Sequence, residues 1–348
     1  MKQISHKDGL KSKQTTSMYS IKIEEQPEEI LKWLYIGTNL PVWPEFYSYI
    51  LHDIKTFKAK SLLLKEYGNI IGHVLVYNEN ADILYFGFFG VLNHESNKIV
   101  FLLNELIKYG KQRNFKKILG PVNVPITIYG WGFMDKDSDA NLYIGKPINP
   151  PIYQEMFLDN GFIVKTKELS VEGPVLNYGK KILSKFDSEN YEVYNPQDWK
   201  EVIDFKSNFF KLNANLPPES VITPGTENLY ENYIRFIREY GALFMITFLK
   251  YKVTNEIVGC FFCIPNPFRK DESGVYDSYM AFIILVDNEH QGKGLGVLLS
   301  FYSAKKAWEN KILYNSTPMD SKAKLSIALT KKFGLKPKRA HLILEYTI

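Results

Sequence analysis

Cysteine is nearly absent from this sequence. The chain has 348 residues but two cysteines, which form the single C-x-x-C motif Cys260 to Cys263. The motif lies in an apolar segment typical of a β-strand, where side chains three residues apart point to opposite faces. We therefore expect two buried core thiols and no redox pair. With no other cysteine, and with six histidines that never fall in the spacing H-x-x-x-H, no metal site is predicted either.

Long apolar runs and blocks of charge are also missing. No run approaches the roughly 20 apolar residues of a membrane-spanning helix. Residues 1–18 lack the apolar centre of a secretory signal, so they are predicted to form a disordered tail. The formal net charge is +5, and lysines are interspersed with acids. Neither a membrane nor a nucleic acid is expected as a partner, although a small polyanion is compatible with this charge. These features favour a cytoplasmic protein.

A repeated order of elements is present. Periodicity predicts, in the first half, strands near 61–66, 70–77 and 83–91, a helix near 97–112 and a strand near 116–119. The second half repeats it, with strands near 242–250, 257–264 and 279–287, a helix near 294–309 and a strand near 312–317. The prediction is two tandem domains, 19–175 and 190–348, of the α+β (mixed α/β) class. Each would be a mostly antiparallel twisted sheet flanked by helices.

Local matches align the two copies. Gly72 and Gly259 follow similar apolar pairs, with an offset of 259 − 72 = 187. After the next loop the offset becomes 286 − 91 = 195, and the longer loop Pro265–Gly274 accounts for the eight extra residues. Ile118 and Ile312 continue it at 312 − 118 = 194. Duplication is favoured, although unrelated α/β domains could share such an order.

A glycine-rich loop follows the predicted strand 279–287. Residues 288–297 read NEHQGKGLGV. The dinucleotide fingerprint G-x-G-x-x-G and the Walker loop G-x-x-x-x-G-K-[ST] both fail on spacing. Glycines between a strand and a helix let backbone N–H groups point inward, where the positive end of the helix dipole also attracts anions. The loop is therefore predicted to bind a diphosphate.

The pattern Gln291-x-x-Gly294-x-Gly296 resembles the cofactor loop of the GNAT superfamily of acyl-CoA N-acyltransferases. The resemblance implies acetyl-CoA or another acyl-CoA as cofactor. It implies that the loop backbone holds the pyrophosphate and that the end of the preceding strand bonds the pantetheine arm. The implied cofactor-binding residues are Ile284, Leu285, Val286, Gln291, Gly292, Lys293, Gly294, Leu295 and Gly296.

Further segments resemble a group of bacterial and archaeal proteins with tandem GNAT-like halves. These segments are Leu119 to Asn123, Asn149 to Tyr153, and Gly161-Phe162. The offset of 195 places residues 96–101 opposite the loop, and they contain no glycine. The N-terminal copy is therefore predicted to be degenerate and to bind no CoA. Its aromatic stretch 128–133 could wall an acceptor cleft or pack in the core.

The family mechanism implied by the resemblance is direct attack of an amine on the thioester, with a backbone N–H near Val286 stabilising the oxyanion. Many GNAT enzymes use a tyrosine acid where this chain has Thr330, and a threonine hydroxyl is too weak an acid to replace it. Asp277, Tyr279 and Tyr314 are the candidate catalytic residues, for which plain structural roles are the alternative.

The predicted function is therefore an acyl-CoA-dependent N-acyltransferase, of the N-acetyltransferase type. It would act on an amine of a small molecule or a peptide. Two alternatives stay open: a non-catalytic acyl-CoA sensor, and a peptidyltransferase-like protein with paired GNAT-like domains.

Overall fold

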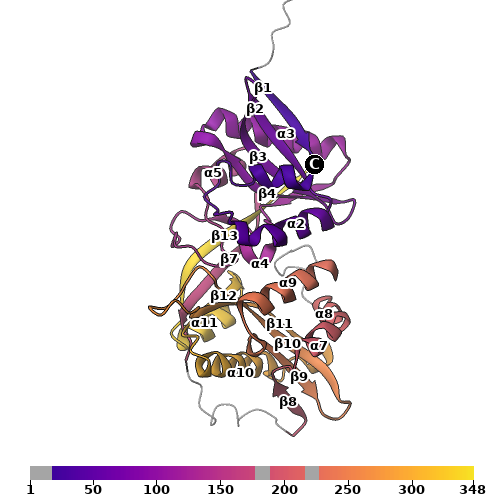
Figure 1. The fold of residues 1–348 in the computed structure, drawn as a ribbon, viewed down its shortest axis with the longest axis vertical. Coiled ribbons are helices and arrows are strands. Elements are labelled where there is room, and N and C mark those ends of the chain that lie inside the picture. Colours follow the sequence, from indigo (N-terminus) through magenta and orange to yellow (C-terminus); the bar gives the residue numbers. More distant parts are fainter. Residues whose placement is uncertain (1–17, 177–188, 216–226) are drawn as a thin grey trace, which may run out of the picture.

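A computed structural model describes residues 18–176, 189–215 and 227–348. Nearly all of the predicted tail and most of the predicted boundary at 175–190 lie outside these ranges. In the part of the chain so described, a mixed 13-stranded sheet carries helices on its faces (Figure 1). The predicted α+β class is confirmed, and the two expected sheets join edge to edge into one.

The strands of the N-terminal half are β1 (Tyr19–Glu24), β2 (Lys60–Glu66), β3 (Asn69–Tyr77), β4 (Ile83–Val91), β5 (Lys117–Gly120), β6 (Phe133–Met134) and β7 (Ile163–Pro174). Those of the C-terminal half are β8 (Tyr191–Tyr194), β9 (Ile246–Tyr251), β10 (Glu256–Pro265), β11 (Ser278–Val286), β12 (Tyr314–Asp320) and β13 (Lys336–Thr347). The predicted strands 61–66 and 70–77 correspond to β2 and β3, which pair as an antiparallel hairpin around the turn at Tyr67 and Gly68.

The two halves exchange their last strands. The order across the sheet is β1-β2-β3-β4-β5-β13-β7-β12-β11-β10-β9-β8, and β6 pairs with β13 away from this path. Strand β13 therefore extends the N-terminal half beside β5, and β7 extends the C-terminal half beside β12, as Figure 1 shows. Strand β7 contributes to two buried ion pairs: Glu172 pairs with Arg339 of β13 and Glu168 with Lys146 of the loop before α5, each at 2.6 Å. A one-residue slip would separate these charges, so the pairs favour this register.

The helices of the N-terminal half are α1 (Pro27–Trp33), α2 (Tyr47–Thr56), α3 (Ser96–Gln112), α4 (Ile126–Tyr129) and α5 (Pro151–Asp159). Those of the C-terminal half are α7 (Trp199–Asp204), α8 (Lys206–Asn213), α9 (Glu227–Tyr240), α10 (Leu295–Glu309) and α11 (Lys324–Lys332). Short turns of 3-10 helix lie at Pro44–Phe46, Leu92–His94, Leu243–Met245 and Asn288–His290. None of the helices described is long and apolar enough to cross a membrane.

Helices pack on both faces of the C-terminal sheet, and β10 shows this directly. Cys263 meets Ser303 of α10, with 3.5 Å between sulfur and oxygen. Phe262, one residue earlier, packs its ring against Phe209 of α8 and Tyr230 of α9. Both thiols are buried and free, as predicted. Burial raises the pKa of the Cys263 thiol to about 12, so it is inert at neutral pH.

The strand registers test the alignment of the two copies. Gly72 pairs with Val91 and Gly259 pairs with Val286, which are the partners that the offsets 187 and 195 require. The predicted offset of 194 beyond the helix is wrong. Ile83 pairs with Lys117 and Ser278 with Tyr314, and 314 − 117 = 197. The difference arises because the connection before α10 is longer and α10 itself is shorter than α3.

Candidate functional site

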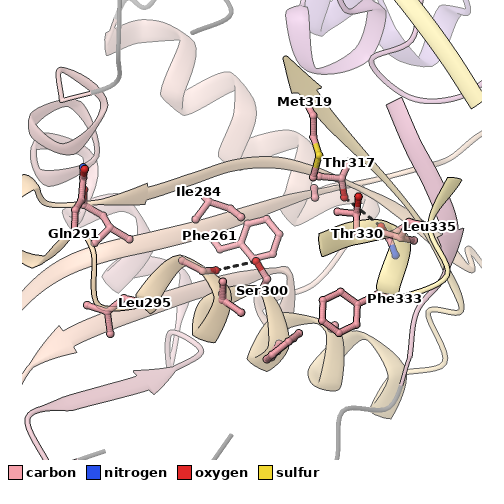
Figure 2. A pocket seen from close by; sticks show the side chains of 18 of the residues that line it. Phe261, Ile284, Gln291, Leu295, Ser300, Thr317, Met319, Thr330, Phe333 and Leu335 are labelled. Carbon is pink, nitrogen blue, oxygen red and sulfur yellow. Dashed lines mark hydrogen bonds between the residues drawn. The ribbon is translucent and has the colours of Figure 1, made fainter. Parts of the chain in front are cut away.

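A cavity of about 510 Å³ lies in the C-terminal half. Strands β11 and β12 and helices α10 and α11 form its walls (Figure 2). Figure 2 shows Gln291 and Leu295 toward one end, and Thr330, Phe333 and Leu335 toward the other. The lining is mainly apolar, with a few polar side chains: Tyr279, His290, Gln291, Ser300, Asn315, Thr317 and Thr330.

Divergence of two parallel strands opens this cavity. Strands β11 and β12 pair only from Ser278–Tyr314 to Met280–Ser316. Beyond Ser316, β12 continues against β7, so the edge of β11 from Ala281 to Val286 has no neighbouring strand on that side among the described residues. A one-residue bulge at Phe282 keeps Ala281 on the same face as Ile284 and Val286, and all three line the cavity.

The backbone at the end of β11 points toward the cavity. Asp287 N donates to Val258 O at 2.8 Å, so Gly259 and Val286 form a pair without hydrogen bonds between them. The N–H and C=O of Val286 therefore face away from β10. The carbonyl accepts a hydrogen bond from Gln291 Nε2 at 3.0 Å, which ties the loop to the strand end.

The glycine loop then starts helix α10. Gly292 and Gly294 have φ angles of 78° and 74°, in the left-handed region that favours glycine. Gly294 is the N-cap, with no side-chain cap in this described segment, so N–H groups of the first turn are left to face the cavity. Gly296 has ordinary helical geometry, and a Cβ there would meet only Ile284 Cγ2, at 3.8 Å. A larger side chain at position 296 would therefore fit the protein itself. It would project into the cavity and take up space that a ligand there could use.

Two predicted loop residues do not line the cavity. Leu285 is buried on the opposite face of β11. Lys293 points outward, and its Nζ donates to Tyr191 Oη at 3.1 Å. The same hydroxyl lies 2.8 Å from His290 Nδ1, and His290 lines the open end of the cavity.

The predicted catalytic residues are dispersed. Tyr279 lines the cavity, but Asp277 and Tyr314 do not. Asp277 pairs with Arg269, whose Nε is 3.0 Å from Oδ1. Tyr314 donates to the buried carboxylate of Glu172 at 3.3 Å, and burial together with Glu172 raises the pKa of Tyr314 to about 12. Thr330 does line the cavity, and its hydroxyl donates to Ile327 O at 2.9 Å.

Sequence reasoning missed most of the cavity wall. One signal was present in α10, where the small residues Gly296, Ser300 and Ala304 recur every four positions and therefore share one helix face. Asn315 was missed as well. It lies in β12 opposite Tyr279, a position that an apolar residue would usually fill.

The matching space in the N-terminal half is filled. Val91 corresponds to Val286, and its N–H donates to Tyr153 Oη at 2.9 Å. Tyr153 is fully buried and its hydroxyl donates to Gly37 O. Phe86 stacks on Phe157 of α5 with ring centroids 5.0 Å apart. Protein groups thus take the positions that the C-terminal half leaves open.

The matching connection also differs in length and charge. Between β4 and α3 the chain has four residues (92–95), and between β11 and α10 it has eight (287–294). In the N-terminal half, Lys98 in the first turn of α3 pairs with Glu66 at 3.1 Å and with Glu95 at 2.9 Å. Two carboxylates at this helix start disfavour a phosphate there.

No protein-family model matches the sequence, and no curated protein does. Solved structures are similar over nearly the whole chain. A tandem GNAT protein from the clavulanic acid biosynthesis pathway has a TM-score of 0.59 at 10% identity, over 94% of this chain and 98% of its own. A GCN5-related N-acetyltransferase from Sphaerobacter thermophilus has 0.54 at 8%, over 94% and 95%. A glucosamine N-acetyltransferase region of a fungal multi-domain β-N-acetylglucosaminidase has 0.61 at 12%, over 95% and 38%. The likeness establishes a tandem GNAT fold.

Proposed function

We propose that this protein is an acyl-CoA-dependent N-acyltransferase that binds one acyl-CoA, in its C-terminal half. The observation that carries the proposal is the junction of β11 and α10. An open strand edge, a glycine loop and an uncapped helix start meet there at the mouth of an apolar cavity. The solved structures of similar fold include N-acetyltransferases, which supports the same reading.

The residues present fit an acyl-CoA. The first-turn N–H groups of α10, with the positive end of the helix dipole, suit a diphosphate. The outward-facing backbone of Ile284 and Val286 suits an amide-bearing arm, as a neighbouring strand would. Gly296 leaves the space that a side chain would close. When bound, an acyl-CoA supplies the acyl group as an activated thioester for an amine of a small molecule or peptide.

The chain's own part in the chemistry is to orient that group, exclude water and move protons. The apolar wall of Phe261, Phe301 and Phe333 excludes water from the cavity. Of the predicted catalytic residues, Tyr279 alone lines the cavity, so we expect Tyr279→Phe to lower the transfer rate. Asp277→Asn and Tyr314→Phe should act through stability, because both side chains bond to protein groups outside the cavity.

Calorimetry with CoA and acetyl-CoA tests the binding site. Gly294→Val should abolish binding, because the side chain would crowd the loop. Gly274→Val is the matched control: Gly274 also has a positive φ, 82°, and has open space around it, so it reproduces the backbone strain away from the cavity. Unchanged CoA affinity in Gly294→Val, or equal losses in both variants, would refute the site.

A non-catalytic acyl-CoA sensor is the second candidate. It is favoured by Thr330 at the place of the usual tyrosine acid, and by the engagement of Asp277 and Tyr314 elsewhere. Transfer assays against a panel of amines distinguish the two functions. A chain that binds acetyl-CoA with normal affinity and acylates no amine would support the sensor.

A further inference from the structure

The cavity extends beyond the open edge of β11. The backbone from Ser278 to Met280 is paired with β12, yet Tyr279 still lines the cavity, together with Ala281, the first residue of the open edge, and Ala304 of α10. Along α10, Ala304 follows Gly296 by 304 − 296 = 8 residues, or about 12 Å of helix. A ligand arm that pairs with the open edge therefore ends before the cavity does. We refer to the part lined by Tyr279, Ala281, Ala304 and Asn315 as the deep end.

Two alanines create the space at the deep end. The strand register equates Ala281 with Phe86, since 281 − 86 = 195, and they pair with the equivalent residues Cys263 and Val76. Lys311 and Asn114, which follow α10 and α3 with matching hydrogen bonds, give an offset of 311 − 114 = 197. That offset equates Ala304 with Ile107, since 304 − 107 = 197.

In the N-terminal half these two positions are filled. Phe86 is fully buried and stacks on Phe157, and Ile107 packs in the same core cluster. The same fold is therefore closed by large side chains at these positions and opened by alanine.

The amide of Asn315 faces the deep end. The side chain is nine-tenths buried, at 8% exposure, and lines the cavity. Its Oδ1 accepts from Thr317 Oγ1 at 3.3 Å, whereas Nδ2 has no partner among the residues of the described ranges. The equivalent residue in the N-terminal half is Ile118, since 315 − 118 = 197, and it is fully buried. The C-terminal half thus has a hydrogen-bond donor where its counterpart has an aliphatic side chain.

A neutral acceptor is the group that matches this donor. A purely apolar chain at the deep end would exclude water from Asn315 Nδ2 and leave it buried without a bond, which is costly. A carboxylate would need a cation, and the deep end as described presents no charged side chain. A keto or hydroxyl oxygen would satisfy the amide without burying a charge.

We infer that the deep end is an acyl subsite, selective for a short acyl chain longer than acetyl that carries a keto or hydroxyl oxygen. Ala281 and Ala304 set the length that fits, and Asn315 sets the preference for the oxygen. The inference rests on the proposed function, because it assigns the acyl group of the same acyl-CoA. It concerns binding, so it holds for an enzyme and for a sensor alike.

Isothermal titration with four probes tests this subsite: CoA, acetyl-CoA, butyryl-CoA and acetoacetyl-CoA. The last two have the same chain length and differ by one keto oxygen. Wild-type protein should bind acetoacetyl-CoA about tenfold more tightly than butyryl-CoA, the difference expected when a buried donor is satisfied. Acetoacetyl-CoA should also bind more tightly than acetyl-CoA.

Two variants test separately the acyl-chain length that fits and the preference for an oxygen on that chain. Asn315→Leu should reverse the preference, so that butyryl-CoA binds about tenfold more tightly than acetoacetyl-CoA. Ala281→Phe, which copies Phe86, should remove the advantage of both longer chains while CoA affinity stays within about twofold of wild type. If Ala281→Phe lowers the melting temperature, Ala304→Val offers a smaller obstruction at the same depth. Ser300→Ala, which removes a cavity-lining hydroxyl that donates to Gly296 O at 2.8 Å, controls for loss of a polar group that does not bond Asn315.

Each outcome is decisive. Equal affinities for butyryl-CoA and acetoacetyl-CoA in the wild type would overturn the role of Asn315. Tighter binding of acetyl-CoA than of either longer chain would overturn the subsite, even with CoA bound normally. If none of the four probes binds, the proposed function itself fails. A parallel loss for all acyl-CoAs in Asn315→Leu would show that the amide bonds the thioester carbonyl instead, which also refutes the inference.

Discussion

The two halves of this chain follow one topology and differ in what occupies the space beside their fourth strands, β4 and β11. In the C-terminal half the strand end opens onto a 510 Å³ cavity, and small side chains face it. In the N-terminal half Tyr153 bonds the equivalent backbone N–H, and large side chains fill the interior. The comparison shows that side-chain volume and a single hydrogen-bonded tyrosine, not topology, distinguish a cavity from a core in this fold.

The strand exchange lets the N-terminal half contribute to the structure of the C-terminal half. Strand β13, which follows the candidate site in sequence, completes the sheet of the N-terminal half beside β5. Strand β7 in turn completes the sheet of the C-terminal half beside β12, the strand that carries Asn315. The N-terminal half therefore supports one wall of the cavity, because each half depends on the other for a strand.

The largest expected effect comes from removing the tyrosine that fills the N-terminal half. Tyr153→Ala should lower the free energy of unfolding by about 3–5 kcal/mol, because it leaves a cavity among the rings of Phe89, Phe133 and Phe157. Tyr153→Phe removes only the hydroxyl and should cost about 1–3 kcal/mol through the unpaired N–H of Val91. Urea unfolding measures both. A stable Tyr153→Ala protein that binds a second CoA would contradict the conclusion that many side chains fill the N-terminal half. It would show that the Tyr153 ring alone blocks a binding site there.

The pH dependence of stability should reveal a second difference between the halves. His73 in β3 is buried, and its register equivalent in β10 is Cys260, since 260 − 73 = 187. Burial lowers the pKa of His73 to about 4 from 6.5, and burial lowers that of His341 in β13 to about 3. Below pH 6.5 the unfolded chain therefore binds protons that the folded chain does not. Stability is complete above pH 6.5 and falls as the pH drops toward 4.

Each buried histidine should cost about 1.4 kcal/mol per pH unit below 6.5. Two histidines over the 1.5 units to pH 5 give a loss of about 4 kcal/mol, measured by urea unfolding at a series of pH values. His73→Cys copies the C-terminal half and should halve the slope of unfolding free energy against pH, whatever its own cost in stability. An unchanged slope would show that His73 is not neutral in the folded protein.

Substitutions in the first turns of α10 and α3 should affect CoA binding differently. Gly296→Val should raise the Kd for CoA at least 100-fold, or about 2.7 kcal/mol, because the side chain fills the mouth of the cavity. The melting temperature should not fall, because Cβ has open space and valine suits a helix better than glycine. The matched variant Asn97→Val in the first turn of α3 should leave CoA affinity unchanged. Calorimetry should give one CoA per chain. A stoichiometry of two would contradict the conclusion that the N-terminal half leaves no space for CoA.

Much of this architecture could be predicted from local sequence. The strand pairs at Gly72 and Gly259 fall in the register that the offsets predicted, because alternation and turn residues fix a hairpin locally. The glycine loop lies where it was predicted, between β11 and α10, because glycine at a positive φ has a local signature.

Long-range features could not be predicted. The exchange of β7 and β13 depends on pairs such as Leu344 with Gly120, which are far apart in sequence and have no local signal. Tyr153 lay in a segment noted only for resemblance, because its function depends on Val91 across the fold. Asn315 reads as an ordinary strand residue, and only the packing of the whole half places it on the cavity wall. The roles of Asp277, Tyr279 and Tyr314 stay predictions.

The smallest expected effect is at Thr330, where many enzymes of the resembled family have a tyrosine. Its hydroxyl already donates to Ile327 O, so the hydroxyl proton is engaged by a backbone carbonyl. A thiol of pKa about 8.5 can leave as a thiolate near neutral pH without an obligatory acid, so loss of this hydroxyl should matter little. We expect Thr330→Ala to change kcat/KM by less than about tenfold, or under about 1.4 kcal/mol of barrier. Thr330→Tyr, which introduces the tyrosine of the resembled family, is the matched variant, and a pH profile of kcat/KM is measured for the three proteins. A large loss in Thr330→Ala would show that threonine does act in proton transfer. A large gain in Thr330→Tyr alone would show that the C-terminal cavity can use a tyrosine acid that it lacks.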